Sequence, residues 1–173
     1  MDELGRLSKS AFQEAKKAPI AVVLENVRSM HNVGSVFRTC DAFLVNKIYL
    51  CGYTPKPPHR EIQKTALGAT ETVEWEGIEN IDDCIHKLKT SGYTIVSVEQ
   101  VHGSISLEKY SINSTQPLAL VFGNEAEGIS ASTIEASDAC IEIPQFGSKH
   151  SFNISVSAGI VLWELYKQIK VME

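Results

Sequence analysis

Short apolar runs rich in β-branched residues recur along the chain, and segments of helical length separate them. The clearest runs lie at 19–27, 46–52, 93–99, 117–123 and 139–144, and an alternating run lies at 70–77. Runs of this length and composition are typical of buried strands. Strands that alternate with helices indicate a parallel sheet with helices on both faces. Because 173 residues suffice for one such core, we expect a single α/β domain.

The segments between the runs carry helix signals. We expect helices at 7–17, 31–43, 61–68, 80–92, 129–138 and 151–170, with Asn80 and Ser130 as N-caps. In the segment 31–43 one apolar stripe contains Val33, Val36, Phe37, Cys40 and, just beyond it, Leu44. Arg38 and Ser35 then point away from that stripe. A lone arginine on a helix is usually a solvated charge, so a role for Arg38 needs support from elsewhere in the chain.

The expected last helix has one long apolar face and an unusual run of small residues. The apolar face contains Ile154, Ala158, Val161, Leu162, Leu165 and Ile169. The small residues are Ser155, Ser157, Ala158 and Gly159. Glycine in a helix interior costs about 1 kcal/mol relative to alanine. We therefore expect a neighbouring element or a second subunit to approach this helix closely.

The sequence also indicates the compartment and argues against a metal site. The opening MDELGRLSKS lacks the apolar core of a secretory signal, and no apolar run is long enough for a membrane span. We therefore expect a cytoplasmic protein without a membrane partner. The four cysteines, Cys40, Cys51, Cys84 and Cys140, form no C-x-x-C pair and have no histidine at metal-ligand spacing. We expect buried, reduced thiols and no metal.

Charge is distributed unevenly along the chain. The formal net charge is −5, which argues mildly against a nucleic-acid partner. The segment 26–64, however, holds six cations against two anions, a balance of +4 that leaves −9 for the rest. A local basic surface can bind phosphates even on an acidic protein. The charge pattern alone leaves open whether this is such a surface or a chance cluster.

Three polar loops follow buried strands in the C-terminal half. One follows the strand that ends near Glu99, the second is Gly-Asn-Glu-Ala-Glu-Gly at 123–128, and the third spans 144–153. Ligands of parallel sheets bind beyond the carboxyl ends of the strands. Neither G-x-G-x-x-G nor G-K-[ST] is present, which disfavours an ordinary nucleotide-binding sheet. Ser151 and Asn153 also suit plain helix capping, and the 123–128 loop also suits a tight surface turn.

Taken together and in order, the motifs over about 19–168 resemble the SpoU–TrmH family of the SPOUT RNA methyltransferases. The family motif N-x-x-S-x-x-R-T-x-x-A is matched by Asn32, Ser35, Arg38, Thr39 and Ala42. The motif G-x-E-x-x-G is matched by Gly123, Glu125 and Gly128. The third motif, I-P-x-x-G followed by S-L-N-V-S, is matched by IPQFGSKHSFNIS, with Phe152 in place of leucine. KTALGATE at 64–71 also resembles the family.

The resemblance implies a parallel α/β fold with a C-terminal trefoil knot, in a methyltransferase domain at 19–173 after a helical extension at 1–18. It implies a homodimer, packed partly through the last helix, that methylates a ribose 2′-hydroxyl of tRNA or rRNA. It also implies bound S-adenosylmethionine, held near Glu99, Gly123, Gly128, Ile143, Ser151 and Phe152. The short flanks are similar to those of the minimal members, which act on small tRNA targets.

The resemblance also assigns catalytic roles. Arg38 takes part in removing the ribose proton, but an arginine pKa above about 12 makes it a difficult base. We therefore expect Arg38 to clamp a phosphate with its planar fork and to stabilise the developing oxyanion, while that phosphate or a water accepts the proton. Asn32 and Glu125 would orient Arg38 or the ribose, and Ser151 and Asn153 would hold the substrate or the methionine end.

Two alternatives stay open at this point. A knotted RNA-binding protein without catalysis would be expected to lack one of Asn32, Arg38 and Glu125, and all three are present. A related knotted enzyme could instead methylate a base nitrogen, and only the resemblance of the first motif favours the ribose.

Overall fold

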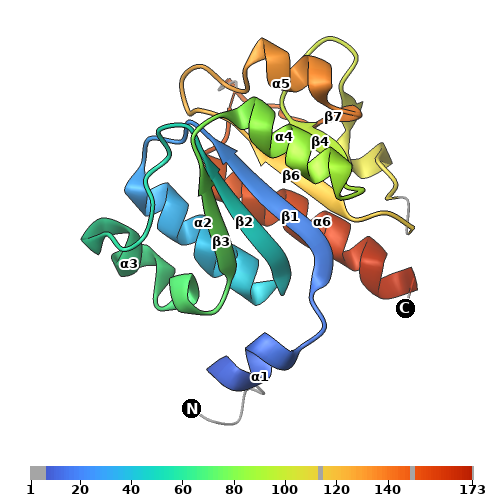
Figure 1. Cartoon of the computed structure of the whole chain (residues 1–173). Coiled ribbons are helices and arrows are strands. Elements are labelled where there is room, and N and C mark those ends of the chain that lie inside the picture. The colour runs from blue at the N-terminus through green and yellow to red at the C-terminus, as the bar shows by residue number, and fades with distance from the viewer. Residues whose placement is uncertain (1–6, 113–114, 149–150, 173) are drawn as a thin grey trace.

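Seven strands form one sheet in the computed structural model, which describes residues 7–112, 115–148 and 151–172 (Figure 1). Their order across the sheet is β3-β2-β1-β6-β4-β7-β5, and every paired ladder is parallel. The strands are β1 (Ala18–Glu25), β2 (Val45–Cys51), β3 (Glu74–Ile78), β4 (Thr94–Val98), β5 (Ile105–Ser106), β6 (Leu118–Phe122) and β7 (Ala139–Glu142). The expected parallel sheet is confirmed.

Helices cover both faces of this sheet, as expected. One face carries α2 (Met30–Ala42), α3 (Arg60–Ala66) and α6 (Ile154–Met172), and the other carries α4 (Ile81–Thr90) and α5 (Ala131–Ala136) (Figure 1). The short α1 (Lys9–Glu14) lies beyond the start of β1, and its Phe12 is buried. The trefoil knot and the division of the chain at residue 18 stay predictions.

The N-caps and apolar faces that predicted the helices are present in the structure. The Asn80 side chain accepts from the Asp82 backbone N–H at the start of α4, and Ser130 caps α5 in the same way. The stripe of α2 is fully buried against the sheet, and Arg38 is exposed on the opposite side of the helix. The apolar face of α6 is likewise buried from Ile154 to Leu165.

Three expected boundaries are wrong. The strand expected at 70–77 starts only at Glu74, because the preceding Ala69–Glu71 is a 3-10 helix, η2. Thr72 donates to the Asp41 carboxylate, and Thr70 donates to Gln63 Oε1 at 3.1 Å, so tertiary contacts override the alternating pattern. α1 is shorter than expected and α6 begins at Ile154 rather than at 151. The two-residue β5 and the 3-10 helix η3 (Leu107–Lys109) were not expected.

Gly34 allows α2 and α3 to pack closely. A Cβ built on Gly34 would lie 2.2 Å from Thr65 Oγ1 and 2.3 Å from the Ile62 carbonyl oxygen. Both distances are far below van der Waals contact, so a side chain here would push α3 away from α2. The close approach fixes the position of α2, which carries Asn32 toward the carboxyl ends of the strands.

We expect Gly34→Ala to lower the free energy of unfolding by about 1–3 kcal/mol through overpacking, although alanine favours a helix. Urea denaturation followed by circular dichroism measures the change. Adding Thr65→Ala should not restore stability, because the Ile62 carbonyl would still be in the way. A Gly34→Ala protein as stable as the wild type would contradict the packing argument.

Candidate active site

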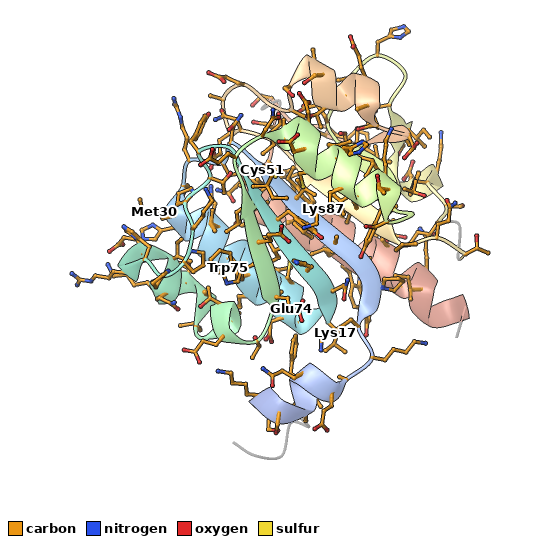
Figure 2. The ribbon with its side chains drawn as sticks, in the orientation of Figure 1. Lys17, Met30, Cys51, Glu74, Trp75 and Lys87 are labelled. Atoms are coloured by element: carbon orange, nitrogen blue, oxygen red, sulfur yellow. The ribbon has the colours of Figure 1, made fainter. Side chains whose placement is uncertain are left out.

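A cavity of about 320 Å³ lies where β4, β6 and β7 end. In Figure 2, Cys51 marks this end of the sheet and Glu74 the opposite end. The cavity is lined by every residue that the sequence predicted for cofactor binding, namely Glu99, Gly123, Gly128, Ile143, Ser151 and Phe152. These six residues come from three separate loops, so the structure brings the predicted set together.

The loop 123–128 folds back on itself at the mouth of β6. Asn124 and Gly128 exchange two backbone hydrogen bonds, at 3.0 and 2.9 Å. A Cβ on Gly123 would lie 2.4 Å from the Gly128 backbone, and Gly128 has a φ of +73°. A Cβ on Gly128 would also meet Glu99 Oε2 at 2.6 Å. The glycines therefore serve the turn itself, as the tight-turn interpretation expected, and the close ligand approach stays a prediction.

Asn124 holds this loop in place, and the sequence analysis did not single it out. It is 5% exposed, and its Oδ1 accepts from the backbone N–H groups of Ala126 and Glu127 at 2.7 and 2.9 Å. Its Nδ2 donates to the Asn26 carbonyl at 2.9 Å and to the Tyr53 hydroxyl at 2.7 Å. Asparagine side chains in turns often accept from a backbone N–H group two residues on, and this tendency could have identified Asn124.

The Glu125 carboxylate accepts hydrogen bonds from the loop between β1 and α2 and from the first turn of α2. Its carboxylate accepts from the backbone N–H groups of Arg28 at 3.0 Å and Ser29 at 3.2 Å, and from Asn32 Nδ2 at 3.1 Å. Asn153 Nδ2 in turn donates to Asn32 Oδ1 at 3.1 Å. Three of the residues predicted as catalytic, Asn32, Glu125 and Asn153, thus form one hydrogen-bonded chain beside the cavity.

These contacts keep Glu125 ionised. Partial burial by itself would raise the pKa of this carboxyl. Hydrogen bonds from the backbone N–H groups of Arg28, Glu125 itself and Ser29, together with the Asn32 amide, outweigh burial and hold the pKa below its usual value. Glu125 is therefore an acceptor that fixes Asn32 and is not suited to act as a proton donor at neutral pH.

Asn153 caps α6, as one of the two interpretations expected, and its predicted role in holding the substrate or the methionine end stays a prediction. Its Oδ1 accepts from the Ser155 backbone N–H at 2.9 Å, which caps α6, and from Ser155 Oγ at 2.6 Å. Its amide nitrogen donates to Asn32, so the same side chain caps α6 and belongs to the network with Glu125. Ser151 is exposed and lines the cavity two residues earlier.

Arg38 lies away from this network. Its side chain is exposed and makes no hydrogen bond or ion pair with the described part of the chain. Arg38 is six residues after Asn32 on α2, which places it about 9 Å along the helix axis and about 120° around it. It does not line the cavity. Within one chain, the structure does not bring the predicted catalytic arginine to the predicted cofactor residues.

The basic stretch 26–64 is not one continuous surface. Lys47 lies on the α4 face of the sheet and pairs with Glu76 at 2.8 Å, and Lys87 pairs with the same carboxylate at 2.6 Å. The two ammonium groups hold the pKa of Glu76 below its usual value. Lys64 pairs with Glu61 at 2.7 Å. Within this stretch, the exposed cations that make no ion pair with described residues are Arg28, Arg38, Lys56 and Arg60.

The outer side of α6 is open. A Cβ on Gly159 would meet nothing within 4 Å among the described residues. Val156 and Trp163 lie on the same stripe, 48% and 55% exposed, although the Trp163 ring also tilts against Phe43. On the inner side of α6, Ala158 is buried and α2 packs against the helix, so a neighbouring element approaches there as expected. At Gly159 the described part of the chain supplies no close neighbour.

Other features of the described residues bear on ligands and location. None of the helices in residues 7–112, 115–148 and 151–172 is long and apolar enough to span a membrane. In the same ranges, no cluster of three His, Cys, Asp or Glu side chains could hold a metal ion. Cys40, Cys51 and Cys84 are buried free thiols as expected, whereas Cys140 is only half-buried.

A parallel sheet with a cavity, a glycine-bracketed turn and a carboxylate–amide network at its carboxyl ends defines an α/β protein that binds a ligand there. The sequence model of the SpoU rRNA Methylase family matches residues 19–163. That match covers well over half of the sequence, so the chain belongs to this family.

Named relatives agree with that assignment. The chain is 34% identical over 161 residues to tRNA (guanosine(18)-2'-O)-methyltransferase of Aquifex aeolicus, covering 90% of this chain and 72% of that protein. It is 31% identical over 160 residues to 23S rRNA (guanosine-2'-O-)-methyltransferase RlmB of Neisseria meningitidis, covering 92% of this chain and 63% of that protein. The chain therefore spans less than two thirds of the Neisseria relative.

Solved structures have the same fold. The A. aeolicus TrmH/SpoU tRNA modifying enzyme superimposes with a TM-score of 0.82 at 29% identity, covering 95% of this chain and 81% of that one. The AdoMet-bound rRNA methyltransferase from Sinorhizobium meliloti gives a TM-score of 0.79 at 27% identity, covering 88% and 58%.

We expect Glu125→Gln to lower the free energy of unfolding by about 1 kcal/mol at neutral pH, because the backbone donors lose a charged acceptor that is partly screened by solvent. The pKa of Glu125 is lowered in the folded state, so its contribution is complete above the unfolded-state pKa. It is lost as the pH falls through the folded-state pKa, and the two proteins should then converge.

Urea denaturation at a series of pH values measures this difference. Glu127→Gln is the matched control, because it removes an exposed carboxylate from the same loop. A stability difference between wild type and Glu125→Gln that stayed constant down to strongly acid pH would exclude the charged network.

Proposed function

We propose that this protein is an S-adenosylmethionine-dependent RNA methyltransferase that methylates a ribose 2′-hydroxyl of tRNA or rRNA, and that it acts as a homodimer in the cytoplasm. The observation that carries the proposal is the Asn32–Glu125–Asn153 network beside a cavity lined by all six predicted cofactor residues. The two relatives described above are both named as RNA 2′-O-methyltransferases, which supports the ribose as target over a base nitrogen.

The cavity suits S-adenosylmethionine in size and lining. Its volume of about 320 Å³ lies in the range of small-molecule sites. Ile143 and Phe152 offer apolar surface to the adenine, and the exposed backbone of the 123–128 loop offers polar groups. Glu99 lines the cavity and is held by the Ile129 backbone N–H at 3.1 Å, so a carboxylate faces a ligand that carries positive charge.

When bound, S-adenosylmethionine supplies an activated methyl group on its sulfonium. The residues of the chain then have to hold the ribose hydroxyl in line and stabilise the charge that develops on its oxygen. The Glu125–Asn32 pair is held rigidly for orientation, and Ser151 and Asn153 hold the substrate or the methionine end. The Arg38 guanidinium clamps a phosphate and stabilises the oxyanion, and the phosphate or a water takes the proton.

The position of Arg38 supports a site that draws on both subunits. Arg38 and Asn32 diverge around α2, so one ligand in the cavity of the same chain would not meet both. The open stripe of α6, with Gly159, Val156 and Trp163, is an apolar surface of the kind that a second copy covers. A dimer through this stripe would place the arginine of one subunit near the cavity of its partner.

We expect the wild-type protein to transfer tritium from labelled S-adenosylmethionine to total RNA, and nucleoside mass spectrometry to find a 2′-O-methyl nucleoside. Arg38→Ala should abolish transfer and leave cofactor binding intact in calorimetry, and Ile143→Trp should abolish both by filling the cavity. Refolding the two variants together should restore about a quarter of the sites, because each mixed dimer regains one complete site.

Each outcome bears on a separate part of the proposal. No transfer by the wild type to any RNA would favour an RNA-binding protein without catalysis, and a methylated base would favour base-nitrogen chemistry. Failure of the mixed dimers to recover activity would place Arg38 and the cavity of one site in the same chain.

We expect Gly159→Leu to convert the protein to a monomer in size-exclusion chromatography with light scattering, and to abolish transfer. A Cβ at this position meets nothing within 4 Å among the described residues, so we expect the subunit to fold, with helix α6 stabilised by up to about 1 kcal/mol. His86→Leu is the control, since it likewise places a leucine at a helix position, here an exposed one of α4 on the other face of the sheet. A dimeric, active Gly159→Leu protein would exclude this interface.

A further inference from the structure

Tyr53 presents an aromatic ring to solvent beside the site. The residue is 54% exposed, although its hydroxyl accepts from Asn124 Nδ2 at 2.7 Å. Asn124 directly precedes Glu125 and is buried. The tyrosine thus touches the active-site loop by its polar tip and leaves much of its ring uncovered. Single exposed aromatic residues are common on protein surfaces, so exposure alone assigns no role to Tyr53.

The backbone that carries Tyr53 is rigid. Cys51, labelled in Figure 2, ends β2, and the chain turns at once through Gly52, which has a φ of +62°. A Cβ on Gly52 would lie 1.9 Å from Asn26 Oδ1, so the turn presses against the loop that follows β1. The same Asn26 oxygen accepts from the Tyr53 backbone N–H at 3.3 Å.

Thr54 anchors the other side of the turn. It is 1% exposed, its hydroxyl contacts the carbonyls of Leu24 at 3.0 Å and Cys51 at 2.7 Å, and it accepts from the Val27 backbone N–H at 3.1 Å. The backbone on either side of Tyr53 is therefore fixed, and the ring is held at its hydroxyl by Asn124. A ring that is both rigid and exposed loses little conformational entropy when it binds a flat partner.

A cation lies in the adjoining segment. Val27, which is bonded to Thr54, precedes Arg28, and the Arg28 backbone N–H bonds Glu125. The Arg28 side chain is exposed and makes no ion pair with the described residues. Tyr53 and Arg28 thus stand on adjoining segments, and an exposed aromatic ring and an exposed guanidinium are the side chains that bind unpaired nucleotides, through base stacking and a phosphate contact.

We propose that Tyr53 stacks on the nucleobase of an unpaired nucleotide next to the target ribose, so that the RNA substrate is recognised in a single-stranded segment and not in a duplex. This inference rests on the proposed RNA methyl transfer and deepens it. Tyr53 is then a substrate-positioning residue that selects single-stranded RNA over a duplex. Asn124, which donates to the Tyr53 hydroxyl, connects the stacked base to the loop that carries Glu125.

The test compares Tyr53→Ala, Tyr53→Phe and Tyr53→Trp in tritium transfer to total RNA from a strain in which the gene is deleted. Tyr53→Ala should raise KM for RNA about ten-fold, whereas Phe and Trp, which keep a stacking face, should stay within about three-fold of the wild type. Calorimetry should give the same S-adenosylmethionine affinity for all three variants. Single-stranded poly(U) should inhibit the wild type more strongly than the poly(A)·poly(U) duplex, and Tyr53→Ala should lose this preference.

Four results would overturn the assignment. An unchanged KM in Tyr53→Ala, with an active wild type, would remove the stacking role alone. Equal loss in Tyr53→Phe and Tyr53→Ala, together with weaker cofactor binding, would show that the hydroxyl merely supports the Asn124 loop. A monomeric Tyr53→Ala protein would make the ring a subunit contact. Equal inhibition of the wild type by poly(U) and the duplex would exclude recognition of single strands. Absence of transfer by the wild type itself would instead count against the proposed function.

Discussion

The Glu125 carboxylate is the point on which the rest of the site depends. It joins the loop after β6 to the backbone of Arg28 and Ser29 in the loop after β1, and through Asn32 it reaches Asn153 at the start of α6. Hydrogen bonds from backbone N–H groups to a carboxylate are among the stronger neutral-to-charged contacts in proteins. Three loops that a parallel sheet would only bring near one another are thereby tied into one frame.

Within one chain, the cavity and Arg38 lie on different sides of this hydrogen-bonded network. The cavity, with Glu99 and the glycine-bracketed turn, lies on one side of the network, and Arg38 projects from another side of α2. In the proposed dimer, the cation of one subunit would complete the site of its partner, and the apolar stripe around Gly159 would position the two. Such an arrangement would make activity depend on assembly without any change in the fold of the subunit.

Much of this architecture could be predicted from the sequence, because its signals are local. Period and length indicate the strands, and Asn80 and Ser130 mark helix starts. The residues around the cavity could be predicted because they follow buried strands of a parallel sheet and match family motifs. A knot has no local signal at all, so the predicted trefoil knot rests on the family resemblance alone.

Features that depend on tertiary partners escaped prediction. Nothing in the sequence pairs Asn124 with Tyr53, which are 71 positions apart. The alternating residues at 70–73 suggested a strand, but their side chains bond to α2 and α3. Lys47 counted toward a basic surface, yet its place on β2 turns it to the opposite face of the sheet, where Glu76 neutralises it. Two of the hydrogen bonds in the network of Glu125, Asn32 and Asn153 join residues that are 97 and 121 positions apart. During synthesis, the early donors at Arg28 and Asn32 must therefore wait for Glu125 and then Asn153 to emerge from the ribosome, so the machinery that recognises the ligand is among the last parts of the molecule to take shape.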